Sequence, residues 1–396
     1  MNKYSNYKIA WFPDKLESFR KKEVVAPIYV RIKPTNRCNH DCPTCIYMPN
    51  YYSASSMVRA EEMPKEKLFE VVNDLVEMKI RAITWSGGGE PLFHPNIVDA
   101  IHIARSGNID QSIISNGQLL NLDKAAELSD FKWVRISFDY WDHKSFAKTR
   151  GTNRRGFDIV LKNAENFAKQ KSKDCTLGAG YIVSRENYKK IYGMASILKD
   201  IGFENIRFSA LEKIGLGDPL QDKSAYGAKG PSKAASRAMV SLRKRETALQ
   251  LEQPIKGTGT QDNFSGYHRK VEGEVLEELR RCRRELEDDN FKVYDSYDID
   301  FQSQSSQSEK CYIQQIIPVI AGDSNVYSCH NKAYDKTGLI GSIKKQSFKD
   351  LWYSDKTKEV FDSFSPLKSC QGQICSANAR NIIITEIMNA DGVNFI

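Results

Sequence analysis

A repeated strand-then-helix rhythm between about Pro27 and Leu211 limits the fold more than any other feature of this 396-residue chain. Short apolar runs typical of strands recur there, at 28–32, 82–85, 111–115, 133–138, 176–183 and 205–208. Runs with apolar residues at helical spacing lie between them, at 64–79, 157–169 and 188–199. Six such units in series predict a parallel sheet, and their length suits a partial (β/α)6 barrel of TIM-like form. Ligands of such barrels collect at the carboxyl ends of the strands.

Three cysteines follow the first predicted strand with the spacing C-x3-C-x2-C. They are Cys38, Cys42 and Cys45. A structural zinc site normally closes its tetrahedron with four protein ligands, whereas an iron-sulfur cube held by three cysteines leaves one iron open to a small molecule. The spacing therefore indicates an open cluster at which chemistry can start.

A glycine-rich turn follows the second predicted strand and contains Gly88, Gly89 and Glu90. Glycine lets the backbone approach a ligand closely, and the exposed carbonyl groups can accept hydrogen bonds from an ammonium group. Both motifs directly follow strands, so we expect them at the same barrel mouth. The alternative is an ordinary strand-to-helix turn without a ligand.

Together these motifs resemble those of the radical S-adenosylmethionine (radical SAM) superfamily. The resemblance implies that Cys38, Cys42 and Cys45 hold a 4Fe-4S cluster whose open iron binds SAM, and that Gly88, Gly89 and Glu90 hold the methionine amino group. One electron, from a reducing partner of the flavodoxin or ferredoxin type, then cleaves SAM to a 5'-deoxyadenosyl radical that abstracts a hydrogen atom from the substrate. One departure is Thr44, where the family often has an aromatic residue. Tyr47, just beyond, is a candidate for covering the adenine.

Two further polar residues stand at predicted strand ends. Asn116 follows the third strand and Ser137 closes the fourth. The superfamily uses comparable positions for SAM contacts, so both are secondary candidates for cofactor binding. Asn-Gly is also a common turn former and serine a common helix cap, which leaves a purely structural role open for each.

Four late cysteines indicate a second cluster. Cys311 and Cys329 flank a predicted hairpin whose turn begins at Gly322, and Cys370 and Cys375 follow a stretch of helical character. Four thiolates can close a 4Fe-4S cube completely. The arrangement resembles the SPASM and twitch extensions, which hold an auxiliary cluster. Three alternatives stay open: a zinc ribbon from the same cysteines, a ligand set altered by the unusual C-x4-C spacing, and His330 as a substitute ligand.

The remaining two cysteines, Cys175 and Cys282, lack metal-ligand spacing and are predicted to pack in the core. The chain accordingly divides into an N-terminal extension (1–26), a radical SAM core (27–212), a charged, loop-rich insertion (213–308) and a small α+β cysteine-rich domain (309–396). Within the insertion, an amphipathic helix is predicted, with its arginines paired to neighbouring glutamates; its apolar positions are Val275, Leu279, Cys282 and Leu286.

Composition favours a cytoplasmic enzyme. No apolar run reaches the roughly 18 residues of a membrane span, and the N-terminus does not resemble a signal peptide. Nine cysteines in a reducing compartment indicate metal or redox chemistry rather than disulfides. The net charge of +8 permits an anionic partner, but no RNA-binding motif accompanies it, which makes a nucleic-acid partner an unfavoured expectation.

The leading functional hypothesis is oxidation or related modification of a small polar metabolite such as a sugar or aminocyclitol. It rests on the single predicted auxiliary cluster and on the short stretch before Cys38, since peptide-modifying members often carry a leader-binding module there. The runner-up is a peptide or protein maturase that forms a thioether, a crosslink or an oxidised side chain. RNA modification and a zinc-stapled binding protein rank below. Glu212, Arg207 and Tyr181 are candidates for a general base, and the sequence does not choose among them.

Overall fold

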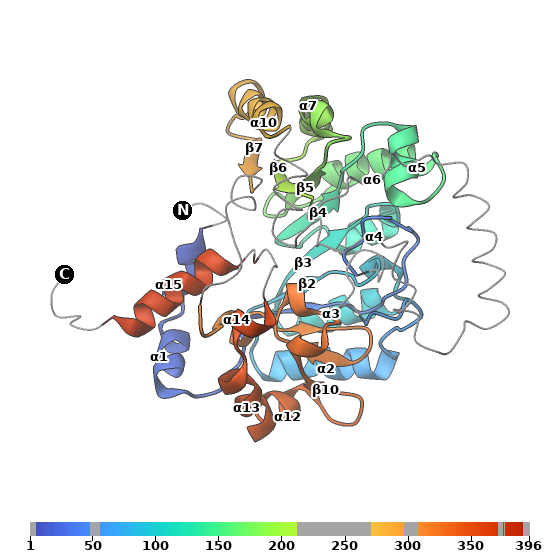
Figure 1. Ribbon diagram of the computed structural model, residues 1–396. Coiled ribbons are helices and arrows are strands. Elements are labelled where there is room, and N and C mark those ends of the chain that lie inside the picture. The colour runs from blue at the N-terminus through green and yellow to red at the C-terminus, as the bar shows by residue number, and fades with distance from the viewer. Residues whose placement is uncertain are drawn as a thin grey trace, which may run out of the picture.

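One continuous sheet organises the computed structural model, which describes residues 5–47, 56–211, 271–296, 308–370, 375 and 377–390 (Figure 1). Its strand order is β10-β9-β8-β1-β2-β3-β4-β5-β6-β7. Strands β1 to β7 run parallel in chain order, as the strand-then-helix rhythm predicts. Among the described residues β7 and β10 are the two edges, so the sheet is open rather than a closed barrel.

All six predicted strands form, with ends shifted by at most two residues. A seventh parallel strand, β7, comes from the segment that the sequence assigned to the insertion. The strands are β1 (Tyr29–Ile32), β2 (Ala82–Trp85), β3 (Asp110–Ser115), β4 (Trp133–Ser137), β5 (Thr176–Val183), β6 (Asn205–Ala210) and β7 (Lys292–Asp295).

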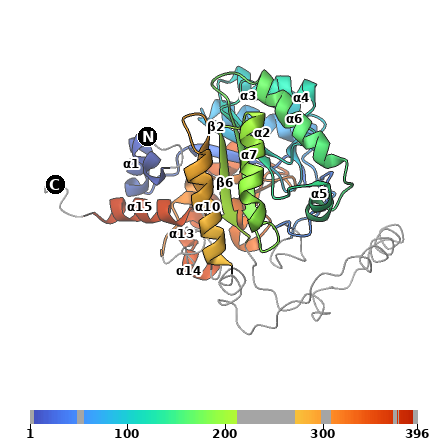
Figure 2. The same cartoon turned by 90° about the horizontal axis from the view of Figure 1, so that it is seen from above.

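Helices cover one face of this sheet (Figures 1 and 2). They are α2 (Lys65–Glu77), α3 (Ile97–Ser106), α4 (Leu122–Glu127), α5 (His143–Arg150), α6 (Gly156–Gln170), α7 (Ile191–Ile201) and α10 (Glu272–Leu286). Short 3-10 turns add η2 (Pro91–Phe93) and η3 (Tyr188–Lys190). The predicted helices correspond to α2, α6 and η3 with α7. The shorter helices α3, α4 and α5 were not predicted from the spacing of apolar residues.

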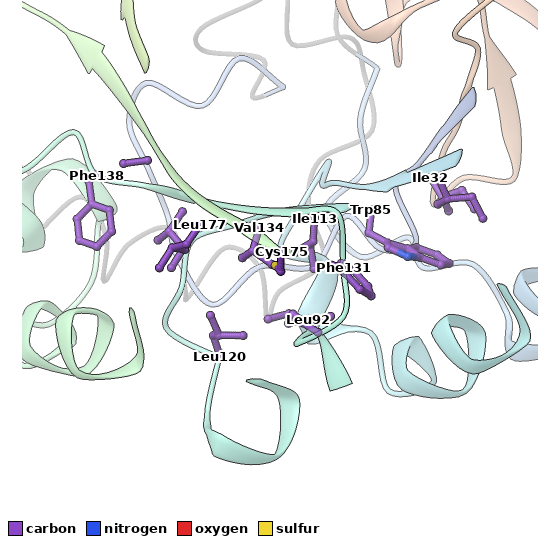
Figure 3. Packing of buried hydrophobic residues seen from close by; sticks show 14 of the residues in the cluster. Ile32, Trp85, Leu92, Ile113, Leu120, Phe131, Val134, Phe138, Cys175 and Leu177 are labelled. Carbon is purple, nitrogen blue, oxygen red and sulfur yellow. The ribbon is translucent and has the colours of Figure 1, made fainter. Parts of the chain in front are cut away.

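The main core lies between the sheet and these helices. Alternate strand residues such as Val134, Ile113 and Leu177 are fully buried there, and Figure 3 shows them packed with Leu92, Leu120 and Phe131. Because side chains alternate across a strand, the other face of the sheet carries a different residue set. Cys175 and Cys282 both lie in this core.

Helix α10 is the predicted amphipathic helix, with its four expected apolar residues buried against α7. Its arginines pair with acidic neighbours, including Arg281 with Glu285 at 3.3 Å and Arg284 with Glu277 at 3.3 Å. The loops that the sequence predicts at 215–237 and 250–266, and the basic helix predicted between them at 233–251, lie outside the described residues, and the domain boundaries stay predictions.

The C-terminal region joins the same sheet. Strands β8 (Val319–Ile320) and β9 (Asn325–Tyr327) form the predicted hairpin, β10 (Leu339–Ser342) follows, and β8 pairs in parallel with β1. The remaining elements are α12 (Phe348–Trp352), α13 (Asp355–Ser363), α14 (Pro366–Ser369) and α15 (Asn378–Asn389), with the turns η4 (Ile313–Gln315), η5 (His330–Lys332) and η6 (Lys336–Gly338).

The N-terminal segment packs against the C-terminal helix. It consists of η1 (Asn6–Trp11) and α1 (Pro13–Lys21), both of which contact α15 (Figure 1). Their shared apolar cluster includes Ile9, Phe19, Ile316 and Ile384. No helix in the described part of the chain is both long enough and apolar enough to span a membrane.

Candidate functional site

The three-cysteine loop and the glycine turn lie side by side where β1 and β2 end. The Gly89 N–H donates to the Thr35 carbonyl at 3.0 Å, and the Glu90 N–H donates to the Arg37 carbonyl at 3.0 Å. Cys38, Cys42 and Cys45 are all half-buried on this loop. Two motifs that are far apart in the sequence therefore form one backbone-bonded unit at the carboxyl ends of the strands.

Glycine is required in the turn because the residues around the cysteine loop pack closely against its backbone. A Cβ atom at Gly89 would lie 2.0 Å from the Arg37 carbonyl oxygen, and one at Gly88 would lie 2.3 Å from the Tyr334 hydroxyl and 2.5 Å from Asn36 Oδ1. Real Cβ atoms do not approach other atoms this closely. The glycines thus serve the packing of the protein itself, whatever ligand their carbonyl groups hold.

Glu90 is fully buried, and its carboxylate ties the second strand end to the third. It accepts hydrogen bonds from Ser115 Oγ at 2.8 Å and from the Asn116 N–H at 2.7 Å. Burial raises the pKa of Glu90, and these donors oppose that rise. The Asn116 side-chain amide reaches the cysteine loop, donating to Asn39 Oδ1 at 2.8 Å and lying 4.0 Å from Cys38 Sγ.

Arg150 is a residue of this site that sequence reasoning missed. It ends α5, is buried, and pairs with Asp139; it also donates to the Ser137 carbonyl at 2.9 Å and lies 3.8 Å from Cys42 Sγ. The adjacent Gly151 has φ +59°, and a Cβ there would meet the Asp41 carbonyl at 2.0 Å. Ser137 therefore contributes its backbone oxygen to the arginine, a contact that no local pattern predicts.

Several buried polar atoms around the cysteine loop have no hydrogen-bond partner among the described residues. They are Asn39 Nδ2, His40 Nδ1, Ser86 Oγ and Arg150 Nε. Buried polar groups are normally satisfied, so unpaired donors gathered at one mouth indicate a ligand that supplies acceptors. Three thiols with such donors suit an iron-sulfur cluster that binds a small molecule carrying a carboxylate. The residues present fit a cluster with bound SAM.

The four late cysteines also gather. Burial raises the pKa of Cys311, and the nearby thiols of Cys329, Cys375 and Cys370 raise it further; the pKa of Cys370 rises to about 12. Among the described residues, no three cysteine, histidine or acidic side chains are close enough to surround a single ion. The assignment of these four cysteines to the auxiliary cluster therefore stays a prediction.

A buried hydrogen-bonded bridge joins the two cysteine regions. Lys33, which is fully buried after β1, donates to the Tyr47 hydroxyl at 2.7 Å and to the Gly87 carbonyl at 2.8 Å. The Tyr47 hydroxyl lies 3.0 Å from His330 Nδ1. Tyr47 is two residues from Cys45, and His330 is adjacent to Cys329.

Tyr47 and His330 both belong to this bridge, and their roles as adenine cover and substitute ligand stay predictions. The Tyr47 ring, which is the candidate for covering the adenine, packs edge-on against the rings of Tyr334 and His330. A ring nitrogen of His330 is likewise engaged with Tyr47, and Lys33 Nζ lies 3.5 Å from the same atom. The contacts with His330 and Tyr334 join segments that are distant in the sequence, so no local pattern predicts them.

Of the three candidate general bases, Tyr181 and Arg207 lie among the described residues, and they contact different partners. Tyr181 is buried, donates to the Asn187 carbonyl at 3.0 Å and packs in the helix-side core. Arg207 Nε donates to Ser296 Oγ at 2.8 Å. Glu212 lies outside the described residues.

Curated proteins resemble about half of this chain. The chain is 24% identical over 199 residues to "Mycofactocin maturase MftC" of Mycolicibacterium smegmatis, covering 50% of this chain and 48% of that protein. It is 23% identical over 191 residues to "PqqA peptide cyclase" of Gluconobacter oxydans, covering 48% and 51%. These alignments span about half the length of the curated relatives.

A solved structure shares the fold over a longer stretch. The crystal structure of Streptococcus suis SuiB superposes with a TM-score of 0.57 at 14% identity, covering 95% of this chain and 79% of that chain.

Two family models match the chain itself. Residues 32–198 match the radical SAM superfamily, and residues 311–376 match SPASM, the iron-sulfur cluster-binding domain. Radical SAM enzymes require a 4Fe-4S cluster and SAM, and SPASM domains bind auxiliary iron-sulfur clusters. This chain belongs to the radical SAM superfamily and carries a C-terminal SPASM domain.

Proposed function

We propose that this protein is a radical SAM maturase that modifies a peptide or protein substrate. The observation that carries the chemistry is the cysteine loop bonded to the glycine turn, with unpaired donors around it. Cys38, Cys42 and Cys45 would hold the SAM-binding cluster, and the four late cysteines would hold the auxiliary one. The bound cofactors supply a 5'-deoxyadenosyl radical that removes a hydrogen atom from the substrate.

The residues around the loop have separate tasks in this proposal. Asn116 and Arg150 orient the cysteine loop and the ligand at the strand ends, since each lies within about 4 Å of a cysteine sulfur, at 4.0 and 3.8 Å. Glu90 holds two strand ends together rather than presenting a free carboxylate. Ser137 acts through its backbone carbonyl.

A peptide substrate is supported by what the relatives are named for. One is a peptide cyclase and another a maturase, and a structure of SuiB has been solved with its precursor peptide SuiA. These names favour the runner-up of the sequence analysis over oxidation of a sugar or aminocyclitol. A reducing protein partner and a cytoplasmic setting remain part of the proposal.

Iron and sulfide analysis after anaerobic reconstitution tests the cofactor assignment. Two cubes should give about eight irons per chain. Replacing Cys38, Cys42 and Cys45 with Ala should abolish 5'-deoxyadenosine formation, and replacing Cys311 and Cys329 should halve the iron. Cys175→Ala and Cys282→Ala are matched controls because both thiols are buried in the core. Unchanged iron in the Cys311/Cys329 variant, or tightly bound zinc, would refute the assignment.

Incubation with substrate candidates tests the peptide assignment. The protein is reduced with SAM in the presence of short peptides encoded beside its gene, and the products are examined by mass spectrometry. A mass change in a peptide, accompanied by 5'-deoxyadenosine, is the expected result. Turnover of sugars or aminocyclitols with no change in any peptide would refute the peptide assignment and favour a small polar metabolite as the substrate.

A further inference from the structure

The buried Arg150 places a positive charge against one ligand of the three-cysteine loop. Its Nη1 donates to Cys42 Sγ at 3.8 Å, and its Nη2 forms the ion pair with Asp139. The donor to Cys38 Sγ, at 3.4 Å, is by contrast the neutral backbone N–H of His40. Cys42 and Cys38 therefore differ in the charge of the groups that donate to them.

Neighbouring groups hold the guanidinium in this position. Its Cζ lies 5.0 Å from the centroid of the buried Tyr140 ring, and Nη2 also donates to the Ser137 carbonyl at 2.9 Å. The backbone of Arg150 is bound to the cysteine loop itself, because the Asp41 N–H donates to the Arg150 carbonyl at 2.8 Å. The charge would have to break contacts with several segments to move away from Cys42.

A fixed charge beside a cluster ligand changes how easily the cluster is reduced. An iron-sulfur cluster gains one negative charge when it accepts an electron, and its reduction potential depends on net charge, on hydrogen bonds to the sulfurs and on solvent exposure. A nearby positive charge stabilises the reduced form more than the oxidised form, and buried charges are screened little by salt. Arginine stays protonated in proteins, so this effect needs no change of protonation.

Asp139 opposes the effect of the guanidinium. Its side chain is largely buried together with that of Arg150, and its negative charge partly cancels the positive one. The two contacts use different nitrogens, since Asp139 binds Nη2 whereas Nη1 reaches Cys42. The ion pair is therefore oriented with its positive member towards the sulfur.

We propose that the Arg150–Asp139 ion pair sets the reduction potential of the cluster held by Cys38, Cys42 and Cys45. This proposal rests on the proposed function, which assigns that cluster to the loop. In the reduction step one electron passes from the reducing protein partner to the cluster, so the partner is oxidised and the cluster reduced. Arg150 stabilises the added negative charge without giving up a proton, and Asp139 keeps the potential low, which a reductant of SAM requires.

Potential measurements on the reconstituted holoenzyme test the proposal. The protein is poised anaerobically at a series of potentials, and each reduced cluster is followed by electron paramagnetic resonance. The SAM-binding cluster is the one whose signal changes when SAM is then added, and the auxiliary signal is an internal reference. Asp139→Asn removes the opposing charge, so the ratio of reduced to oxidised SAM-binding cluster at a fixed potential should rise about tenfold, or about 59 mV for one electron.

The double variant Arg150→Gln, Asp139→Asn replaces both charges by a neutral pair and should lower that ratio about tenfold. The sign separates this role from a purely structural one. Substitutions that only loosened the loop would admit water, which also stabilises the more highly charged reduced form, so the ratio would rise in every variant. Arg150→Lys keeps a positive charge and should give a ratio between those of the double variant and the unsubstituted protein.

The matched control removes an ion pair elsewhere. Arg105 on α3 pairs with Asp130 at 2.8 Å, and Asp130 precedes β4, at the end of the strand opposite to Asp139. The double variant Arg105→Gln, Asp130→Asn should leave the ratio unchanged.

The outcomes that overturn the proposal differ from those that overturn the proposed function. A ratio that changes less than twofold in both Asp139 variants, or that rises in both, would reject the tuning role. If the double variant holds no iron, Arg150→Lys decides by the same sign. Iron content and 5'-deoxyadenosine are measured on the same preparations. SAM cleavage with an unshifted potential rejects this role alone, whereas an unsubstituted protein without a reducible cluster at the loop rejects the cofactor assignment as well.

Discussion

The bridge between the two cysteine regions should open when the Tyr47 hydroxyl is removed. Tyr47→Phe keeps the ring that packs against Tyr334 but deletes the partner of Lys33 at 2.7 Å and of His330 at 3.0 Å. A buried donor left without its acceptor costs about 1–3 kcal/mol. The equilibrium constant for local opening should therefore rise about 5- to 150-fold.

Amide hydrogen exchange measures that opening directly, because exchange of protected amides follows the population of the open state. The informative amides are that of Lys33, which donates to the Ile320 carbonyl at 2.8 Å, and that of Ser56, which donates to the Tyr334 carbonyl at 2.7 Å. Both should exchange faster in Tyr47→Phe. Tyr353→Phe is the control, since Tyr353 is exposed and its hydroxyl forms no hydrogen bond with the described residues.

A double-mutant cycle with Lys33→Met separates the bridge from general loosening. If the Tyr47 hydroxyl acts through Lys33, its removal should cost less once Lys33 is gone, with a coupling of about 0.5–3 kcal/mol. Exchange that changes less than twofold in Tyr47→Phe, or costs that simply add in the double variant, would show that the hydrogen-bonded bridge does not hold these regions together.

Three further perturbations have defined outcomes. Gly89→Ala forces a Cβ to within 2.0 Å of the Arg37 carbonyl, so reconstituted protein should hold about four irons instead of eight; Gly193→Ala, with open space at its Cβ, should hold the full number. Arg150→Met strands the buried Asp139 and should cost about 3–5 kcal/mol in thermal unfolding, whereas Arg105→Met, in an exposed pair, should cost less than about 1 kcal/mol; equal costs would contradict the burial argument. Burial lowers the pKa of Lys15 to about 7, so between about pH 7 and 10.4 the unfolded chain binds the extra proton and stability should rise with pH. Urea titrations across that pH range should show that the free energy of unfolding rises less steeply with pH in Lys15→Met than in the unsubstituted protein. An identical pH dependence in the two proteins would refute the linkage.

Local signals in the sequence predicted the parts of the fold that depend on local spacing. Each strand of the core is an apolar run bounded by turn residues, and the cysteine and glycine motifs directly follow two of them, so their shared position follows from the parallel sheet alone. The pairing of β8 with β1 is different in kind. It joins segments almost 300 residues apart. Strand β8 has only two residues, and so short a strand carries no sequence signal that shows which strand of the sheet it will pair with.

The same limit explains the site residues that the sequence missed. Lys33 and Arg150 look unremarkable in their local segments, and each gains its role from a contact across the fold. Glu90 illustrates the reverse case. Its motif was recognised in the sequence, but only the structure shows that its carboxylate accepts hydrogen bonds from Ser115 and Asn116.

The shared sheet also constrains how the two cysteine regions can move. Backbone hydrogen bonds from Arg31 to Pro318 at 3.0 Å and from Lys33 to Ile320 at 2.8 Å tie the strand before the first cysteine loop to the hairpin between Cys311 and Cys329. Displacing one region relative to the other would break this ladder and expose the edge of β1. The relative position of the two regions is therefore set by strand pairing rather than by the chain that connects them. Because the first cysteine loop follows β1 in the chain, this ladder holds the start of that loop in fixed register with the hairpin between Cys311 and Cys329, and a reaction that depends on the close approach of two atoms requires such fixed positions.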